Sequence, residues 1–123
     1  MLIEGLYSIS SFQNTENSLE ATVALNKNHE VFQGHFPNNP VFPGVCMMQM
    51  IKELLEQAVQ KPLQLSSCSN IKFMAIINPE KNPKLRVQLQ WTKEENTFKA
   101  KCVIAFDETV ALKMSAVYTP KAA

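Results

Sequence analysis

Hydrophobic and polar residues alternate over most of this chain, which is the period-two pattern of strands with one buried face. The clearest case surrounds Val23, where every second residue is apolar. Polar breaks at 94–96 and 107–108 have the length of hairpin turns, so the strands beside them are expected to be antiparallel neighbours. The predicted strands are about residues 2–9, 19–25, 63–77, 84–92, 97–106 and 110–118.

Residues from about 45 to 60 break this alternation and predict one long helix. The first half of this segment is apolar on nearly all sides, whereas the second half is amphipathic, with Lys52, Glu53 and Glu56 on its wetter side. Pro62 ends the segment. A helix that is apolar all round must be covered on several sides. The pattern therefore predicts an α+β fold with one long helix and five or six strands.

Size and composition indicate an ordinary globular chain. Its 123 residues and 13.9 kDa favour one domain over residues 1–123. The net charge of +1, with no basic cluster along the sequence, argues against nucleic acid or a membrane surface as partner. The start of the chain lacks a basic region followed by a long apolar run, and no apolar stretch reaches transmembrane length. We therefore expect a cytoplasmic protein.

The cysteines point to the same compartment. Cys46, Cys68 and Cys102 are odd in number and show no CxxC spacing, which argues against a disulfide framework and against a zinc site. They are expected to be reduced, buried thiols. Cys46 is a candidate exception, because it lies at the start of the predicted helix, where a thiolate is favoured.

The long connection over residues 26–44 carries the candidate chemistry. Connections of this length are uncommon in small domains unless they form binding or active-site loops. Pro37, Pro40 and Pro43 restrict its conformations, and His35 stands among them shortly before the helix. A histidine held beside a helix N-terminus suits acid–base chemistry on a polarised carbonyl.

Residues 34–45 read Gly-His-Phe-Pro-Asn-Asn-Pro-Val-Phe-Pro-Gly-Val and lead into the helix. This segment resembles the signature of the β-hydroxyacyl-acyl-carrier-protein dehydratases, hot-dog-fold enzymes of fatty-acid synthesis. Residues 70–73, followed by a turn with prolines at 79 and 83, resemble the strand after the helix in that family. The resemblance implies an antiparallel sheet wrapped around the central helix, and a homodimer or higher homo-oligomer with the acyl tunnel at its interface.

The resemblance also implies roles for particular residues. His35 would remove the α-proton of a 3-hydroxyacyl thioester, and the Gly44 backbone N–H would polarise the thioester carbonyl. Gln49 stands where the family carries a glutamate or aspartate, and an amide cannot ionise. Glu53 lies one helical turn further on and is the candidate substitute acid. Glu30, which precedes the segment around His35, is a second candidate.

The expected reaction is dehydration to the trans-2-enoyl thioester in fatty-acid or related polyketide or polyene synthesis. The acyl group would be carried on the phosphopantetheine of acyl carrier protein or coenzyme A, with no other cofactor and no metal. Two alternatives stay open: an acyl thioesterase in which Gln49 positions a water, and a non-catalytic acyl-binding subunit in a mixed dimer with an active paralogue. His29 is expected to be structural. The candidate substrate-binding residues are Phe36, Phe42, Pro43, Val45 and Met48, with Met47 and Met74 as further tunnel candidates.

Overall fold

The computed structural model describes residues 4–32 and 41–121 of the chain. Within these residues six strands and one α-helix, α1 (Gly44–Val59), form the architecture, and a short 3₁₀ helix, η1 (Glu30–Phe32), lies in the connection before α1. The strands are β1 (Tyr7–Asn14), β2 (Ser18–Leu25), β3 (Leu63–Phe73), β4 (Lys84–Glu94), β5 (Thr97–Phe106) and β6 (Thr109–Pro120).

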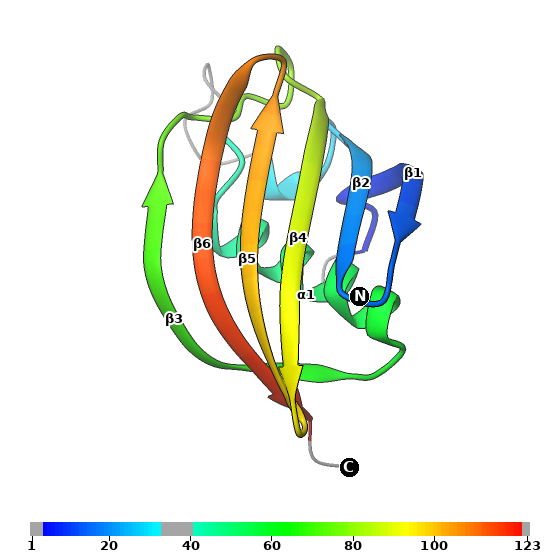
Figure 1. The fold of residues 1–123 in the computed structure, drawn as a ribbon. Helices are drawn as coiled ribbons and strands as arrows, with labels where there is room; N and C mark the ends of the chain where they lie inside the picture. Colours follow the sequence, from blue (N-terminus) through cyan, green and yellow to red (C-terminus); the bar gives the residue numbers. More distant parts are fainter. Residues whose placement is uncertain (1–3, 33–40, 122–123) are drawn as a thin grey trace.

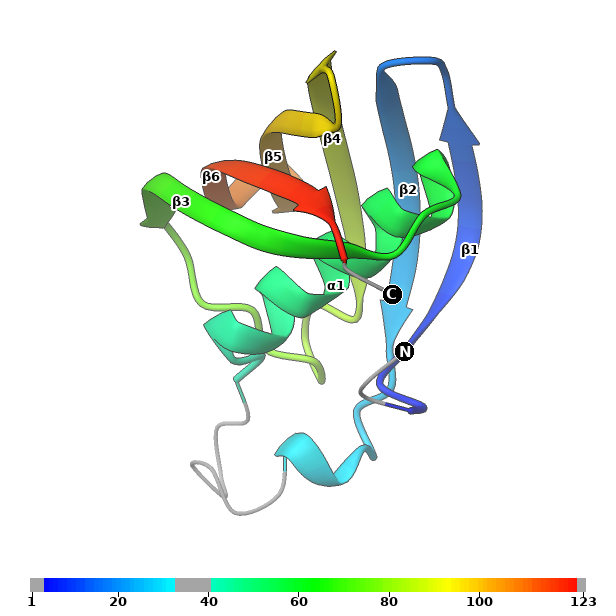
Figure 2. The same ribbon diagram turned by 90° about the horizontal axis from the view of Figure 1, so that it is seen from below.

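The six strands form one antiparallel sheet in the order β1-β2-β4-β5-β6-β3. The sheet curves around α1, which lies along its concave face (Figure 1). Viewed along the strands, β1 and β2 stand on one side of the helix and β3 and β6 on the other (Figure 2). In the chain, α1 follows β2 and precedes β3. It therefore connects β2, near one edge of the sheet, with β3 at the opposite edge. This is the predicted hot-dog arrangement.

The hairpins form where polar breaks interrupt the alternation. Glu95 (φ 57°) and Asp107 (φ 52°) adopt left-handed backbone conformations between β4 and β5 and between β5 and β6. Two-residue turns of this kind match the twist of antiparallel strands. They set a register in which apolar residues oppose one another, as Trp91 opposes Ala100 and Leu89 opposes Cys102. These residues are buried, so one face of the sheet forms the core with α1.

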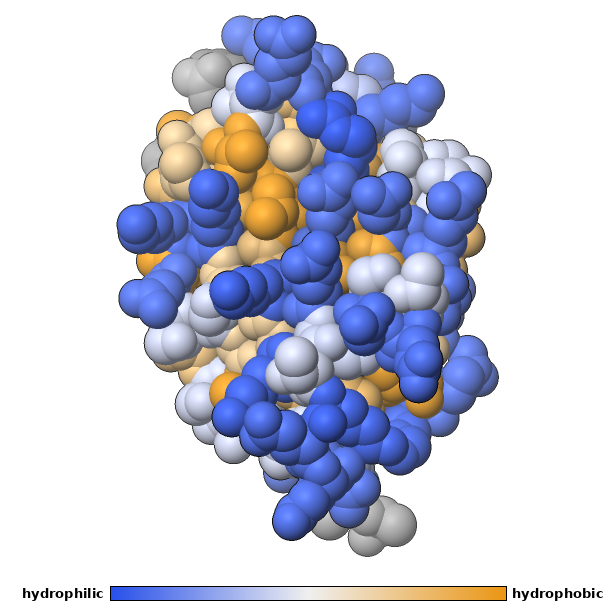
Figure 3. Space-filling view, in the orientation of Figure 1, coloured by the Kyte–Doolittle hydropathy of each residue, from blue (hydrophilic) through white to orange (hydrophobic). Residues whose placement is uncertain are grey.

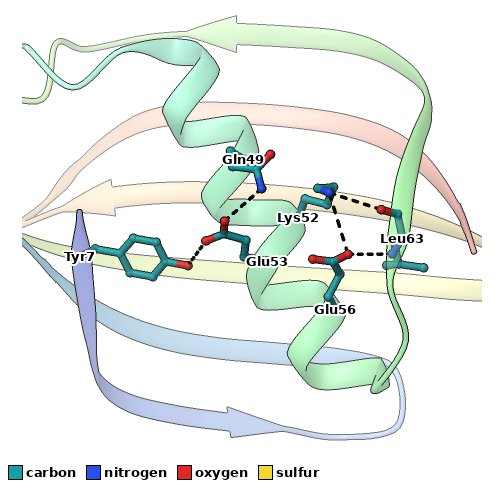
Figure 4. Close-up of polar contacts among 6 residues, drawn as sticks. All are labelled: Tyr7, Gln49, Lys52, Glu53, Glu56 and Leu63. Atoms are coloured by element: carbon teal, nitrogen blue, oxygen red, sulfur yellow. Dashed lines mark hydrogen bonds and ion pairs between the residues drawn. The ribbon is translucent and has the colours of Figure 1, made fainter. Parts of the chain in front are cut away.

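The helix contributes a continuous stripe to that core, and its C-terminal end is tied to β3. Gln60 caps the helix in the left-handed conformation (φ 59°), and its N–H donates to the Glu56 carbonyl. The Glu56 carboxylate accepts a hydrogen bond of 2.7 Å from the Leu63 N–H, and Lys52 donates to the Leu63 carbonyl at 3.3 Å (Figure 4). The buried residues of α1 are Cys46, Met47, Met50, Ile51, Leu54 and Leu55.

Two strand bounds of the prediction are wrong. The first strand begins at Tyr7 and not at residue 2, and β3 ends at Phe73 and not at residue 77. Both β1 and β3 are edge strands, and most of their residues are exposed. Apolar and polar residues therefore alternate only weakly in them, and the sequence does not show where these strands begin or end. Within α1, Val45 is 76% exposed and lies outside the surface that the sheet covers.

Candidate active site

The connection that enters α1 is anchored in the core just before the helix begins. The Phe42 N–H donates to the Ile77 carbonyl at 2.9 Å, and the Phe42 ring packs against Phe32, with ring centroids 6.2 Å apart. These contacts fix the point at which the loop reaches the helix. His35 and Phe36 lie outside the described residues. That His35 lies beside the backbone N–H of Gly44 therefore stays a prediction.

The N-terminal end of α1 carries no side-chain cap. Pro43 is the N-cap residue, and its carbonyl accepts hydrogen bonds from the N–H groups of Cys46 (3.0 Å) and Met47 (3.1 Å). No acidic residue lies in the first turn of the helix. The unpaired N–H groups and the partial positive charge of a helix N-terminus favour an anionic oxygen. This end of α1 therefore offers N–H donors beside Gly44, and the predicted role of Gly44 toward an enolate oxygen stays a prediction.

An aromatic ring approaches Gly44 closely. A Cβ atom at this position would lie 2.8 Å from Cζ of Phe73, at the end of β3. Gly44 does not adopt a positive φ, so backbone freedom is not the reason for glycine here. Phe73 is 53% exposed and covers the start of the helix. The sequence analysis did not identify Phe73 as a site residue, because sheet pairing alone brings it there.

Gln49 and Glu53 form a hydrogen-bonded pair on the face of α1 that points toward β1. The Gln49 amide nitrogen donates to Oε2 of Glu53 at 3.0 Å, and the Tyr7 hydroxyl donates to Oε1 at 2.7 Å (Figure 4). The first contact joins residues four apart, which are neighbours on a helix surface. The second crosses from helix to sheet. The carboxylate of Glu53 thus accepts a donor from each side.

This network determines what each group can do. Because the Gln49 nitrogen faces a carboxylate, its carbonyl oxygen is left as an acceptor for another group. Both Glu53 oxygens accept hydrogen bonds, one from Tyr7 and one from Gln49. Burial raises the pKa of Tyr7, and the hydrogen bond from its hydroxyl to Glu53 raises it further. Tyr7 is therefore a neutral donor across the ordinary pH range.

The predicted acyl-tunnel residues divide into two groups. Phe42 and Met47 are buried core residues, and Met48 packs partly buried against that core. Val45 and Met74 are exposed and lie, with Phe73 and Ile76, among the exposed large hydrophobic residues of the described chain. The exposed members therefore gather where β3 ends beside the start of α1. Phe42 and Met47 do not form an open apolar surface in this state.

A sequence profile of the ApeI-like family, described as ApeI dehydratase, matches residues 11–113. The chain belongs to the ApeI-like dehydratase family. It is 30% identical over 105 residues to the 3-hydroxyacyl-[acyl-carrier-protein] dehydratase FabZ of Lactobacillus helveticus, covering 80% of this chain and 70% of the relative. It is 28% identical over 117 residues to FabZ of Levilactobacillus brevis, covering 89% of this chain and 78% of that protein.

The solved structure titled the dehydratase heterocomplex ApeI:P from Xenorhabdus doucetiae shares the fold. The TM-score is 0.76 at 18% identity, over 89% of this chain and 96% of that one. The predicted family resemblance and the hot-dog fold are confirmed.

His29 and Glu30 lie in the connection between β2 and α1. His29 is structural, as predicted: the Val31 N–H donates to Nδ1 at 3.0 Å, so Nε2 carries the proton and donates to the Glu4 carbonyl at 2.8 Å. Glu30 is exposed at the start of η1. Across residues 4–32 and 41–121, no helix is long and apolar enough to span a membrane, and no three His, Cys, Asp or Glu residues gather to hold a metal ion.

The cysteine predictions need two corrections. All three thiols are free, but Cys68 is exposed, because it lies on the edge strand β3 and not over the core. A reactive thiolate at Cys46 is contradicted, since burial raises the pKa of this thiol. Desolvation therefore outweighs the favourable end of the helix at that position.

Proposed function

We propose that this member of the ApeI-like family dehydrates 3-hydroxyacyl thioesters to trans-2-enoyl thioesters, in fatty-acid or related polyene synthesis. The acyl group would be carried on the phosphopantetheine of acyl carrier protein. The observation that carries the proposal is the uncapped N-terminus of α1 at Gly44, placed directly after the histidine-containing loop motif. Family membership supports the reaction class.

The first chemical step is removal of a proton from the carbon beside the thioester. The thioester oxygen would accept hydrogen bonds from the free N–H groups at the start of α1, which acidifies the α-carbon and stabilises the enolate. The imidazole of His35 would take the α-proton, because its reference pKa of about 6.5 lets it act near neutral pH. The C–H electron pair moves into the enolate.

The second step expels the 3-hydroxyl group. The enolate electrons form the new double bond, the C3–O bond breaks, and the hydroxide needs one proton to leave as water. The imidazolium formed on His35 holds that proton, so atoms and charge balance without a carboxylic acid at residue 49. The Gln49 carbonyl would accept a hydrogen bond from the substrate hydroxyl and orient it, while Glu53 and Tyr7 hold the amide in place.

The working unit is proposed to be a dimer or higher oligomer. An apolar surface of Val45, Phe73, Met74 and Ile76 is exposed beside the start of α1, and β3 presents an unpaired edge. The second candidate function is a subunit that needs a carboxyl-bearing paralogue in a mixed dimer. The amide at residue 49 favours this candidate, because it cannot supply a proton. Its neighbour Glu53 already accepts hydrogen bonds from Gln49 and Tyr7.

The test is to incubate the purified protein with 3-hydroxyacyl-acyl carrier protein and to follow the products by mass. Dehydration predicts the loss of one water from the intact thioester. His35→Ala is expected to remove nearly all activity, roughly a hundred-fold or more for a lost acid–base group, while circular dichroism and oligomeric state stay unchanged. Appearance of free thiol would favour the thioesterase alternative. Activity that requires an added paralogue would favour the mixed dimer.

A further inference from the structure

An extra residue in β3 changes which side of the sheet the end of this strand faces. Ser69 lies opposite Ser115 on β6. Three residues further along β3, Lys72 lies opposite Lys113, which is only two residues further along β6. This is a β-bulge, and Asn70 within it adopts a left-handed conformation (φ 53°) that asparagine tolerates better than most residues.

The bulge places Phe73 on the side of the sheet that faces α1. Phe73 lies opposite Leu112, which is buried, and residues directly opposite each other share a face. Lys72 and Lys113 lie on the other side, which carries mainly hydrophilic side chains (Figure 3). Without the extra residue, Lys72 would lie opposite Leu112 and Phe73 would point away from the helix, because successive strand residues alternate between faces.

The tip of the Phe73 ring points at the start of α1. A Cβ atom at Gly44 would lie 2.8 Å from Cζ of the ring, 2.9 Å from Cε1 and 3.6 Å from Cε2. In an α-helix the Cα–Cβ direction is inclined toward the N-terminus, as the backbone N–H groups are. The ring therefore lies beside the path by which a hydrogen-bond acceptor would approach the Gly44 N–H.

The N–H groups next to the ring are available to an acceptor. The Pro43 carbonyl takes the N–H groups of Cys46 and Met47. Within residues 4–32 and 41–121, no acceptor takes those of Gly44 and Val45. The edge of an aromatic ring carries partial positive charge, so the Phe73 tip is compatible with a negatively charged oxygen on these donors.

Backbone hydrogen bonds hold the chain in place just beyond Phe73. The Met74 N–H donates to the Ala111 carbonyl at 2.7 Å, which ties this segment to β6. The Ile77 carbonyl accepts from the Phe42 N–H at 2.9 Å, which ties it to the connection that enters α1. Although the Phe73 side chain is 53% exposed, its backbone thus has a defined position relative to the start of the helix.

We propose that Phe73 is a specificity-determining residue that admits acyl thioesters unbranched at the α-carbon and excludes those with an α-methyl group. This inference rests on the proposed function. With the thioester oxygen on the Gly44 N–H, the α-carbon is one bond from the carbonyl carbon and within reach of the ring tip. A single carbon added at Gly44 would already lie 2.8 Å from Cζ, so the ring leaves little room for a further methyl group.

The test compares 3-hydroxyhexanoyl-acyl carrier protein with its 2-methyl counterpart, prepared as separate diastereomers. Both substrates keep an α-proton, so both can be dehydrated. The variants are Phe73→Ala and Phe73→Leu, which keeps an apolar side chain but lacks the ring tip. The matched control is Phe12→Ala, which removes a partly buried ring from β1, the opposite edge strand.

The unaltered protein is expected to prefer the unbranched substrate by roughly ten- to two-hundred-fold in kcat/KM, the range that one carbon supplies in a tight pocket. Phe73→Ala should reduce this preference roughly ten-fold by raising kcat/KM for the branched substrate, and Phe73→Leu should change it less in the same direction. Phe12→Ala should keep the preference. No preference in the unaltered protein, or an undiminished preference in Phe73→Ala, would overturn the proposal.

Thermal unfolding tests the contact between Phe73 and Gly44 without any turnover. Gly44→Ala adds the carbon that meets the ring, so it should lower the Tm of the unaltered protein by roughly 2–4 °C. In Phe73→Ala the same change should leave Tm unchanged or raise it, because alanine is favoured over glycine in a helix. An equal loss of Tm in both backgrounds would show that the ring does not occupy this space and would overturn the proposal.

Failure of the proposed function gives a different result. If the unaltered protein turns over neither substrate, the N-acetylcysteamine thioesters of trans-2-hexenoic acid and its 2-methyl derivative are titrated against it, and the Gly44 and Val45 amides are followed by NMR. Shifts caused only by the unbranched probe in the unaltered protein, and by both probes in Phe73→Ala, would support selection by Phe73 without dehydratase activity. Equal shifts with both probes in the unaltered protein, or shifts with neither, would overturn it.

Discussion

The Tyr7 hydroxyl is expected to stabilise both the fold and the geometry at Gln49. Tyr7 is 9% exposed and donates to Glu53 at 2.7 Å, a short hydrogen bond to a charged acceptor. Such bonds contribute about 1.5–3 kcal/mol. Tyr7→Phe keeps the ring and its packing and removes only the donor. Water can reach the half-buried Glu53 carboxylate, and Glu53 keeps its hydrogen bond from Gln49. The loss of stability in Tyr7→Phe should therefore lie near the lower end of this energy range.

We therefore expect Tyr7→Phe to lower the free energy of unfolding by about 1–2 kcal/mol, which is roughly 3–8 °C in Tm for a domain of this size. The measurement is urea unfolding at neutral pH of Tyr7→Phe, Glu53→Gln and the double variant. A coupling of about 1 kcal/mol between the two sites is expected. Tyr118→Phe is the matched control, because Tyr118 is a buried tyrosine on β6 outside this network.

The same variant separates positioning from stability. If Tyr7 acts through Glu53 to hold Gln49, Tyr7→Phe should lower kcat by about ten-fold at a temperature well below Tm and leave KM nearly unchanged. Tyr118→Phe should leave both constants nearly unchanged. A coupling energy below about 0.5 kcal/mol would refute the network, since independent sites add to within that margin. An unaltered kcat in the folded Tyr7→Phe protein would refute its role in positioning.

Two further predictions concern titration. Gln49→Glu places a second carboxyl about where the amide now contacts Glu53 at 3.0 Å, and two carboxyls so close share one proton. The retained proton supplies a general acid, so dehydration should rise ten-fold or more in a pH–rate profile; unchanged rates in a folded variant would assign Gln49 to other chemistry. Burial raises the pKa of the Cys102 thiol to about 12, above its unfolded value of 9.0. As pH rises, the thiol loses its proton in the unfolded chain before it does so in the folded protein. The free energy of unfolding should therefore be unaffected below pH 9 and should fall by about 1.4 kcal/mol per pH unit as pH rises toward 12. Urea unfolding of Cys102→Ala between pH 9 and 11 should show a slope smaller by that amount, and an identical slope would contradict the assignment.

The central strands and the helix could be predicted because local pattern and tertiary burial agree there. In β4 and β5 every second residue faces α1. The alternation of apolar and polar residues in the sequence therefore matches the alternation of buried and exposed residues in the strands. The helix was predicted within one residue at each end, because Pro43 precedes it and Pro62 follows its cap. Edge strands β1 and β3 bury little and were misplaced for that reason.

The site was only partly predictable, because its contacts join distant parts of the chain. Gly44 and Gln49 were identified from a local motif. Tyr7 reaches Glu53 across 46 residues of sequence, and Phe73 reaches Gly44 only through the curvature of β3 around the helix. Neither contact has a periodic or spacing signal.

The most direct test of the dehydratase account is the reverse reaction in water labelled with oxygen-18. The purified protein is incubated with a trans-2-enoyl thioester, and the products are followed by mass spectrometry. The account predicts one labelled oxygen in the 3-hydroxyl group of an intact acyl thioester, formed by the unaltered protein and absent with His35→Ala. Label in a released carboxylic acid would show hydrolysis of the thioester, and that result would contradict the account.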